Sequence, residues 1–391
     1  MPSKSPKLRR LGTILLLGVI AGYGARYVAS RVSRNAIQTS NRLIDWRQAR
    51  RYALRVSQWE QATIPDRLAR RAQYTRLIEQ SEPLIAEYLG VELPQPINRI
   101  HVVDRREWLE ANFTSFEVIF EPVEELYTAV GARQGALGAT LGQINSKVIG
   151  AQMGVLLGFL ARRVLGQYDL SLLSPDPTSR GTLYFVEPNI ARVQQSLGLN
   201  DEDFRLWIAL HEATHVFEFE AYPWVRPYFN DLLRQFLGQV STQLESLGVG
   251  LPQLVSRLLG NRNAEQHWIE RMLTPEQQRV FDQLQALMSL VEGYSNHIMN
   301  AIGERLLPSF KQIEQRIQQR QQNKPLLEEL FNRITGMDLK MAQYQQGEAF
   351  VNAVAASHGV AFINRVWERP EHLPTMAEIR DPKLWIARMG G

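Results

Sequence analysis

Residues 200–222 read NDEDFRLWIALHEATHVFEFEAY, and the rest of the chain is expected to be organised around them. Asn200 is a good helix N-cap, and the carboxylates of residues 201–203 favour the positive end of a helix dipole. Pro223 supplies a stop, and no proline or glycine interrupts the interval. The stretch therefore predicts a capped helix.

This helix carries an H-E-x-x-H motif made by His211, Glu212 and His215. Residues four apart lie about 40° apart around a helix, so both imidazoles can reach one metal ion. Imidazole suits zinc, and two His plus one carboxylate leave a fourth position for water. Glu212 lies roughly 100° round from His211, which suits a general base acting on that water. The alternative is a helix with two structural histidines and a surface glutamate.

Glu292 is the third metal ligand that the sequence favours. It lies in the otherwise apolar segment ALMSLVEGY, residues 286–294, where an unpaired carboxylate would be destabilising and a metal would compensate it. Glu218 is also on the face of His211, about 20° round the helix, but one turn too far along to bind easily. We expect Glu218 to have a supporting role. The alternative for Glu292 is an exposed or salt-bridged residue.

Three polar residues close to Glu292 are further candidates for the site. Tyr294 or His297 could stabilise the oxyanion of a hydrolytic reaction as catalytic residues. Asn296, one helical turn after Glu292, could orient a zinc-binding histidine. The alternative for Tyr294 and His297 is a structural role.

Segments of this chain resemble a bacterial group of zincin-like proteins, described as zinc-dependent metalloproteases. One branch of that group carries a label linking it to deazaflavin-coenzyme biosynthesis. The resemblance covers roughly residues 40 to 390. The segments that carry it are LWIALHEATHVFEFEAYPWVR (206–226), LVEGYSNHIMN (290–300), GMDLKMAQYQQGEAFVNAV (336–354) and LPTMAEIRDPKLWIAR (373–388).

The resemblance implies a zincin-like metallopeptidase fold with H-E-x-x-H on its central helix. It implies His211 and His215 as zinc ligands and Glu212 as the base. In the gluzincin branch of zincins the third ligand is a glutamate on a later helix, which corresponds to Glu292 here. The acid that commonly follows that glutamate by four residues is replaced by Asn296. The resemblance therefore implies a mechanism but does not identify a substrate.

The composition is that of a globular protein, with 45% hydrophobic and 21% charged residues in a chain of 391. The net charge of +4 is a modest basic excess that looks spread out, so it does not indicate nucleic acid as a partner. The chain has no cysteine, which rules out disulfides and Cys-ligated zinc.

The N-terminus carries Lys4, Lys7, Arg9 and Arg10, and residues 11–25 then have no charge. This apolar run is short for a bilayer span, but it reaches the required length if the segment through residue 30 counts. We read residues 1–30 as an anchor or signal-like segment that associates the protein with a membrane through residues 11–30. The alternative is a buried helix in a cytoplasmic protein.

The rest of the chain, residues 31–391, is expected to form one catalytic domain of mainly α, α+β class with a small sheet. Strands are predicted at 97–103 and 182–186, and the second of these could be an exposed edge that binds an extended peptide, or an ordinary buried strand. The Gly- and Ala-rich residues 128–165 predict a buried helix or helical hairpin beside the active site.

The chemistry indicates a zinc-dependent hydrolase that cleaves amide bonds in a peptide or protein. Two rivals stay open. One is a binding or scaffolding protein that keeps the fold without turnover, against which the intact Glu212 argues. The other is an accessory protein in cofactor biosynthesis that hydrolyses a small amide or binds a partner enzyme.

Overall fold

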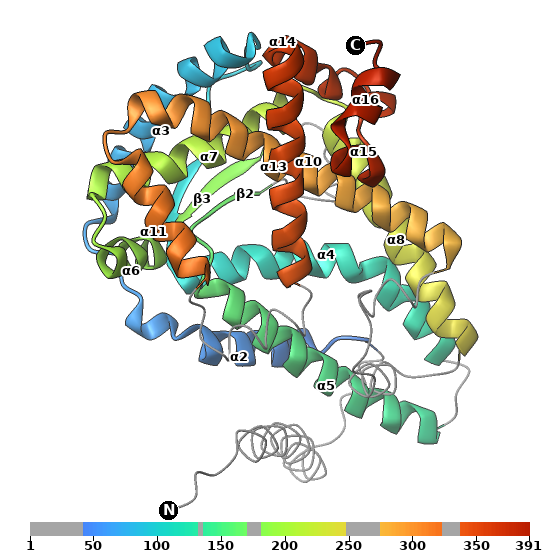
Figure 1. Ribbon diagram of the computed structural model, residues 1–391. Helices are drawn as coiled ribbons and strands as arrows, with labels where there is room; N and C mark the ends of the chain where they lie inside the picture. The colour runs from blue at the N-terminus through green and yellow to red at the C-terminus, as the bar shows by residue number, and fades with distance from the viewer. Residues whose placement is uncertain (1–41, 132–135, 170–180, 248–273, 323–336) are drawn as a thin grey trace, which may run out of the picture.

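The structure is a computed structural model that describes residues 42–131, 136–169, 181–247, 274–322 and 337–391. Helices dominate it, and a three-stranded sheet lies among them (Figure 1). This confirms the expected α+β class with a small sheet. The apolar run of residues 11–25 lies outside the described residues. Within them, no helix has both the length and the apolar character that crossing a bilayer requires.

The longer helices carry the labels of Figure 1. They are α2 (Trp46–Ser57), α3 (Arg67–Leu89), α4 (Arg105–Gly131), α5 (Ala136–Ala161), α6 (Glu187–Leu197), α7 (Asp201–Glu220), α8 (Val225–Leu247), α10 (Pro275–Leu306), α11 (Phe310–Gln322) and α13 (Met337–His358). The short helices α14 (Val360–Ile363), α15 (Met376–Arg380) and α16 (Pro382–Arg388) form the C-terminal part.

The predicted helix at residues 200–222 is α7, and its start is as expected. The side chain of Asn200 accepts a hydrogen bond from the backbone N–H of Asp203, which satisfies one of the free donors of the first turn. Most of the α7 side chains are buried around the whole circumference, and the helix packs against α3 and α10. A helix buried on all sides has its side chains held by neighbours, which suits a site that needs fixed geometry.

The sheet has the strand order β1–β3–β2. Strand β1 (Ile100–Val103) is parallel to β3 (Thr182–Val186), and β2 (Gly166–Asp169) is antiparallel to β3. Both predicted strands are therefore present, but the idea that residues 182–186 form an exposed edge is wrong. β3 is the central strand, with neighbours on both sides. The edge strand that leads toward α7 is β2, a short polar segment.

Side chains alternate across the sheet and enter two separate cores. Leu183 and Phe185 of β3 belong to the larger core, which α3, α7, α10 and the C-terminal helices complete. Tyr184 and Val186, which alternate with them, face the smaller core formed with α2, α4 and α5. The sheet thus joins the layer around α7 to the layer around α2 (Figure 1).

Helices α2 and α5 lie side by side at backbone contact. A Cβ at Gly150, Gly154 or Gly158 would lie 2.3–2.6 Å from the carbonyl oxygens of Asp45, Ala49 and Ala53, in that order. Because the contact positions increase together along both helices, α2 and α5 run in the same direction. The predicted helix within residues 128–165 is therefore present, but it packs along α2 rather than beside α7.

Helices α10 and α13 also cross closely (Figure 1). A Cβ at Gly347 would lie 1.8 Å from the carbonyl oxygen of Ser289, and a Cβ at Gly293 would lie 2.2 Å from the carbonyl carbon of Gly347. Only glycine permits this approach at either position. The crossing fixes α10 at the residue that follows Glu292.

Candidate metal centre

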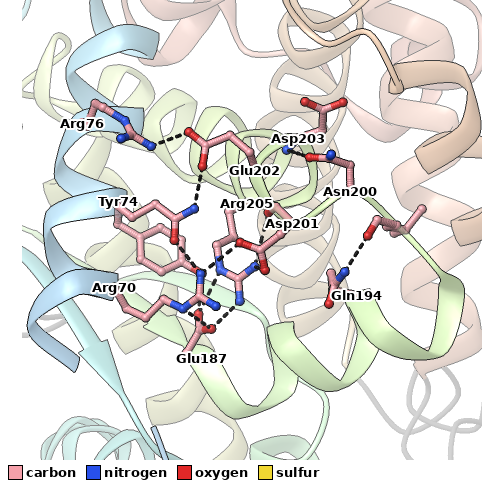
Figure 2. Close-up of polar contacts among 12 residues, drawn as sticks. Arg70, Tyr74, Arg76, Glu187, Gln194, Asn200, Asp201, Glu202, Asp203 and Arg205 are labelled. Carbon is pink, nitrogen blue, oxygen red and sulfur yellow. Dashed lines mark hydrogen bonds and ion pairs between the residues drawn. The ribbon is translucent and has the colours of Figure 1, made fainter. Parts of the chain in front are cut away.

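The first turns of α7 are held by a buried network of charged groups (Figure 2). The guanidinium of Arg205 is fully buried and pairs with the carboxylates of Glu187 and Asp201. Glu187 also accepts a hydrogen bond from the Tyr74 hydroxyl at 2.8 Å, and Arg70 lies 3.3 Å from it. The network joins α3, α6 and α7, and thereby sets the position of the helix six residues before His211.

The structure brings His211, His215 and Glu292 together. One potential ligand atom from each residue lies within 4.8 Å of the other two. The Nε2 atom of His211 is 3.8 Å from Oε2 of Glu292, and the two imidazole rings meet edge to face with centroids 4.8 Å apart. Two residues of α7 and one of α10, 77 positions later in the chain, therefore converge on one point.

The chemistry of these donors fits zinc. In a tetrahedral site with bonds of about 2.0–2.2 Å, two ligand atoms are about 3.4 Å apart, close to the spacing of His211 and Glu292. Two imidazoles and one carboxylate form a donor set used by catalytic zinc sites, in which three protein ligands leave one position open. All three side chains are at least half-buried, so their orientation is restricted.

Glu218 and Ser295 orient His215. Nδ1 of His215 lies 2.8 Å from Oε2 of Glu218 and 3.1 Å from the Ser295 hydroxyl, which itself donates to Oε1 of Glu218 at 3.1 Å. All three groups are buried. With Nδ1 held by a carboxylate, Nε2 is the nitrogen left to face the metal, and its basicity is increased. The structure confirms that Glu218 supports His215 rather than joining the three-residue cluster.

Glu212 is buried between α7 and the edge strand β2. A Cβ on Gly166 would lie 2.4 Å from Oε1 of Glu212, and the backbone N–H of Tyr168 donates a hydrogen bond to the carboxylate. Burial, reinforced by the charge of Glu292, raises the pKa of Glu212 to about 7. A carboxylate with a pKa near neutrality can both accept and return a proton, as a general base requires.

The two histidines have opposite electrostatic environments. Burial and the neighbouring His215 lower the pKa of His211 to about 4, so this imidazole is neutral and able to bind a metal. Burial also acts to lower the pKa of His215, but the charge and hydrogen bond of Glu218 outweigh it and raise that pKa to about 9. The carboxylate of Glu218 therefore favours a proton on His215.

The structure does not bring Tyr294 or His297 to this cluster. They lie about 200° and 140° round α10 from Glu292. The Tyr294 hydroxyl donates to Asn364 at 2.5 Å, and His297 contacts Tyr88 at 2.9 Å and another side-chain oxygen on α13. Their hydrogen bonds are thus made on other faces of the helix.

Asn296 also has a different neighbour from the one expected, because its side chain hydrogen-bonds Glu348. Ser295 takes the orienting role that we expected of Asn296. Its position three residues after Glu292, on nearly the same helix face, is a signal that the sequence contained. Gly166 is the other residue that sequence reasoning missed. It belongs to a strand of four residues that no pattern indicated.

Two histidines and a glutamate around one point, in a mainly helical domain, are a donor set that metallohydrolases use. The chain belongs to the zincin-like metallopeptidase family, whose model matches residues 44–386. No curated protein matches the chain.

A solved structure is also similar. It is a crystal structure from Chloroflexus aurantiacus, described as "a putative hydrolase with a novel fold". It is 57% identical in sequence and has a TM-score of 0.66, and the match covers 88% of this chain and 98% of the other. The family and this neighbour together support a hydrolase that uses a metal.

Proposed function

We propose that this protein is a zinc-dependent peptidase. The observation that carries the proposal is the convergence of His211, His215 and Glu292 within 4.8 Å of one another. The buried carboxylate of Glu212 lies on α7, the helix that carries both histidines. We assign the first three residues as zinc ligands and Glu212 as the general base. Membership of the zincin-like family supports a peptide or protein as substrate.

Each residue has a definite part in this proposal. Zinc bound to the three ligands would acidify a water molecule and polarise the carbonyl of the scissile bond. Glu212, whose pKa is about 7, accepts the proton of the attacking water and passes it to the leaving nitrogen. Glu218 and Ser295 keep His215 in the orientation and tautomer that binding requires. Tyr294 and His297 are left out of the proposed catalytic group.

Strand β2 offers a way to hold the substrate. It is an edge strand of the described sheet, and Tyr168 and Gly166 on it contact the Glu212 carboxylate. An extended peptide that pairs with a sheet edge gains backbone hydrogen bonds without regard to its sequence. A peptide lying along β2 would pass its carbonyl groups in front of Glu212.

The test combines metal analysis with a peptide-library digest. The purified full chain is expected to hold one zinc ion and to cleave peptides. Glu292→Ala should lose the zinc, whereas Glu212→Gln should keep the zinc and lose at least about 100-fold in kcat/KM. Glu304→Ala, at an exposed glutamate on the same helix, is the matched control and should change neither property.

Two results would overturn the proposal. The first is a parent protein that binds no zinc under non-chelating conditions. The second is full cleavage activity in Glu212→Gln. Zinc retained by Glu292→Ala would keep the hydrolase but remove Glu292 from the ligand set.

A further inference from the structure

We propose that the outer face of α2 is a docking surface for an anionic lipid bilayer. The surface consists of Arg47, Arg51 and Arg55, with Leu54 and Trp59 beside them. It lies on the layer formed by α2, α4 and α5 rather than at the metal centre (Figure 1). The inference is independent of the proposed peptidase activity.

The three arginines form an exposed row. They follow one another at intervals of four residues, so they lie on one side of α2, and each is exposed. The opposite side of the helix, with Ala49 and Ala53, is buried against α5. The row therefore points away from the protein, and it belongs to a helix that cannot turn without losing its contact with α5.

These three arginines also lack an acidic partner among the residues that the structure describes. Arg50, on a neighbouring face, pairs with Glu110 and Glu117 at 3.4 and 2.9 Å. Within the described parts of the chain, no ion pair involves Arg47, Arg51 or Arg55. Three exposed guanidiniums on one helix face create a positive potential that attracts a surface of opposite charge.

The C-terminal end of α2 does not reduce this potential. A helix C-terminus carries a partial negative charge from its free carbonyl groups. Here the buried guanidinium of Arg105 donates to the carbonyl oxygens of Ser57 and Gln58, at 3.0 and 3.3 Å. The negative end of the helix is thereby covered by a cation.

A hollow of about 490 Å³ adjoins the row, and Arg51, Leu54, Arg55 and Trp59 contribute to its lining. The guanidinium of Arg106 lies 5.0 Å above the Trp59 ring. Arginine beside tryptophan is a combination that suits a membrane interface, where the ring lies at the level of the headgroups and the cations meet phosphate. Glu60 is the one carboxylate residue that lines this hollow.

The distribution of charge along the sequence supports the same partner. Residues 1–60 hold twelve of the 44 basic residues but only two of the 40 acidic ones, which gives +10 there and −6 in residues 61–391. The basic excess is therefore concentrated at one end, contrary to the even spread that the overall net charge suggested. Charge asymmetry of this kind is typical of proteins that bind membranes or nucleic acid.

The apolar sequence that precedes α2 favours the membrane. Residues 11–25 carry no charge and end 21 positions before Trp46. An apolar run has no role on the phosphate backbone of a nucleic acid, whereas a lipid bilayer can accept it. A basic surface that begins 21 positions after such a run is close enough along the chain to reach the headgroups of the bilayer that the run would enter.

The experiment measures binding of the full chain to vesicles by co-sedimentation at about 0.1 M salt. One set of vesicles is phosphatidylcholine, and the other contains about 30% phosphatidylglycerol. The triple variant Arg47→Gln, Arg51→Gln, Arg55→Gln should bind the anionic vesicles on the order of 100-fold more weakly, at about five-fold for each arginine, and bind the neutral vesicles unchanged.

The matched control removes three exposed arginines elsewhere, with Arg279→Gln, Arg316→Gln and Arg320→Gln on α10 and α11. It should lose little of the binding. Equal losses in the two triple variants would overturn the proposal, as would equal binding of the parent to both kinds of vesicle. Tighter binding to duplex DNA than to the anionic vesicles would also overturn it.

A fluorescent probe gives a second measurement that does not depend on removing charge. Because the chain has no cysteine, Gln61→Cys places a single label at the edge of the hollow, and Gln319→Cys places one on α11. A polarity-sensitive dye at residue 61 should shift to the blue on anionic vesicles, while the dye at 319 should not. The same response at both positions would contradict docking through α2.

Discussion

The two ends of α7 differ in how their acidic and basic groups are matched. At the N-terminal end, the guanidinium of Arg205 is matched by the carboxylates of Glu187 and Asp201, and every group has a partner (Figure 2). At the other end, three carboxylates and two imidazoles lie together, and the charges that shift the pKa values of the two histidines, Glu212 and Glu218 come from histidine and glutamate.

On a single helix, the balance of buried charge separates a structural cluster from a functional one. A network in which every charge has a partner needs no further ion, and it becomes destabilising only when one member is removed. A cluster with excess acid is unfavourable by itself and becomes favourable when a cation is added.

The largest expected effect is at the N-terminal end. Arg205→Ala leaves buried Glu187 without its main cation, and the free energy of unfolding should fall by about 3–5 kcal/mol in chemical denaturation. Arg76→Ala is the control, because its pair with Glu202 is exposed on both sides and should be worth less than about 1 kcal/mol. Similar losses in both variants would show that the network does not hold the helix.

The metal-free protein should show the reverse behaviour at Glu212. Burial raises its pKa from 4.5 to about 7, so the folded state binds the proton more tightly than the unfolded state does. The stability that this group contributes is present below pH 4.5 and is lost as the pH rises through 7. In chelator-treated protein, Glu212→Gln should therefore become more stable than the parent at pH 8, on the order of 3 kcal/mol, with almost no difference at pH 4.5.

Glu60→Gln, at an exposed carboxylate, controls for the removal of one negative charge. A difference between Glu212→Gln and the parent that is the same at both pH values would contradict the assigned pKa.

Zinc should stabilise the parent but not a protein that lacks the third ligand. At a free zinc concentration of about 100 times Kd, the parent should gain about 2.7 kcal/mol in the free energy of unfolding. Glu292→Gln should gain less than about 1 kcal/mol under the same conditions, and without metal it should be no less stable than the parent because it removes acid from the cluster. Equal zinc-dependent stabilisation in both proteins would contradict the contrast between the two ends of α7.

The smallest effect is expected at Ser295. Ser295→Ala removes the hydroxyl that bridges Glu218 and His215, and zinc affinity measured by competition with a chelating dye should fall about ten-fold. Ser289→Ala is a close control, because Ser289 is equally buried on the same helix and its hydroxyl has no partner among the described residues. Loss of affinity in both variants would point to a general change in α10.

Local signals in the sequence predicted much of this centre. The cap at Asn200 and the four-residue spacing of His211 and His215 depend on neighbours along one helix, so they can be read from the chain. A carboxylate in an apolar segment singled out Glu292 for the same reason. The start of α10 is marked by a local feature of the same kind, the capping box between Thr274 and Gln277.

The rest depends on how separate elements pack. Tyr294 and His297 are close to Glu292 along the chain but face other directions, so proximity in sequence was misleading there. The contact of Ser295 with His215 exists because α10 crosses α7, and β2 is too short and polar to give a strand pattern. The order of the three strands, which makes β3 central, is likewise set by packing.

The glycines of α5 have a consequence for how this protein can vary. Gly150, Gly154 and Gly158 each face a backbone oxygen of the neighbouring segment, and backbone cannot rotate away as a side chain can. Any side chain at these positions must separate two helices. In a library of all single substitutions, substitutions at every fourth position of α5 should therefore destabilise the protein. The exposed Val155, next to Gly154, should accept most replacements. That four-residue pattern can be measured by a cell-based screen for the amount of folded protein, without any assay of the metal centre.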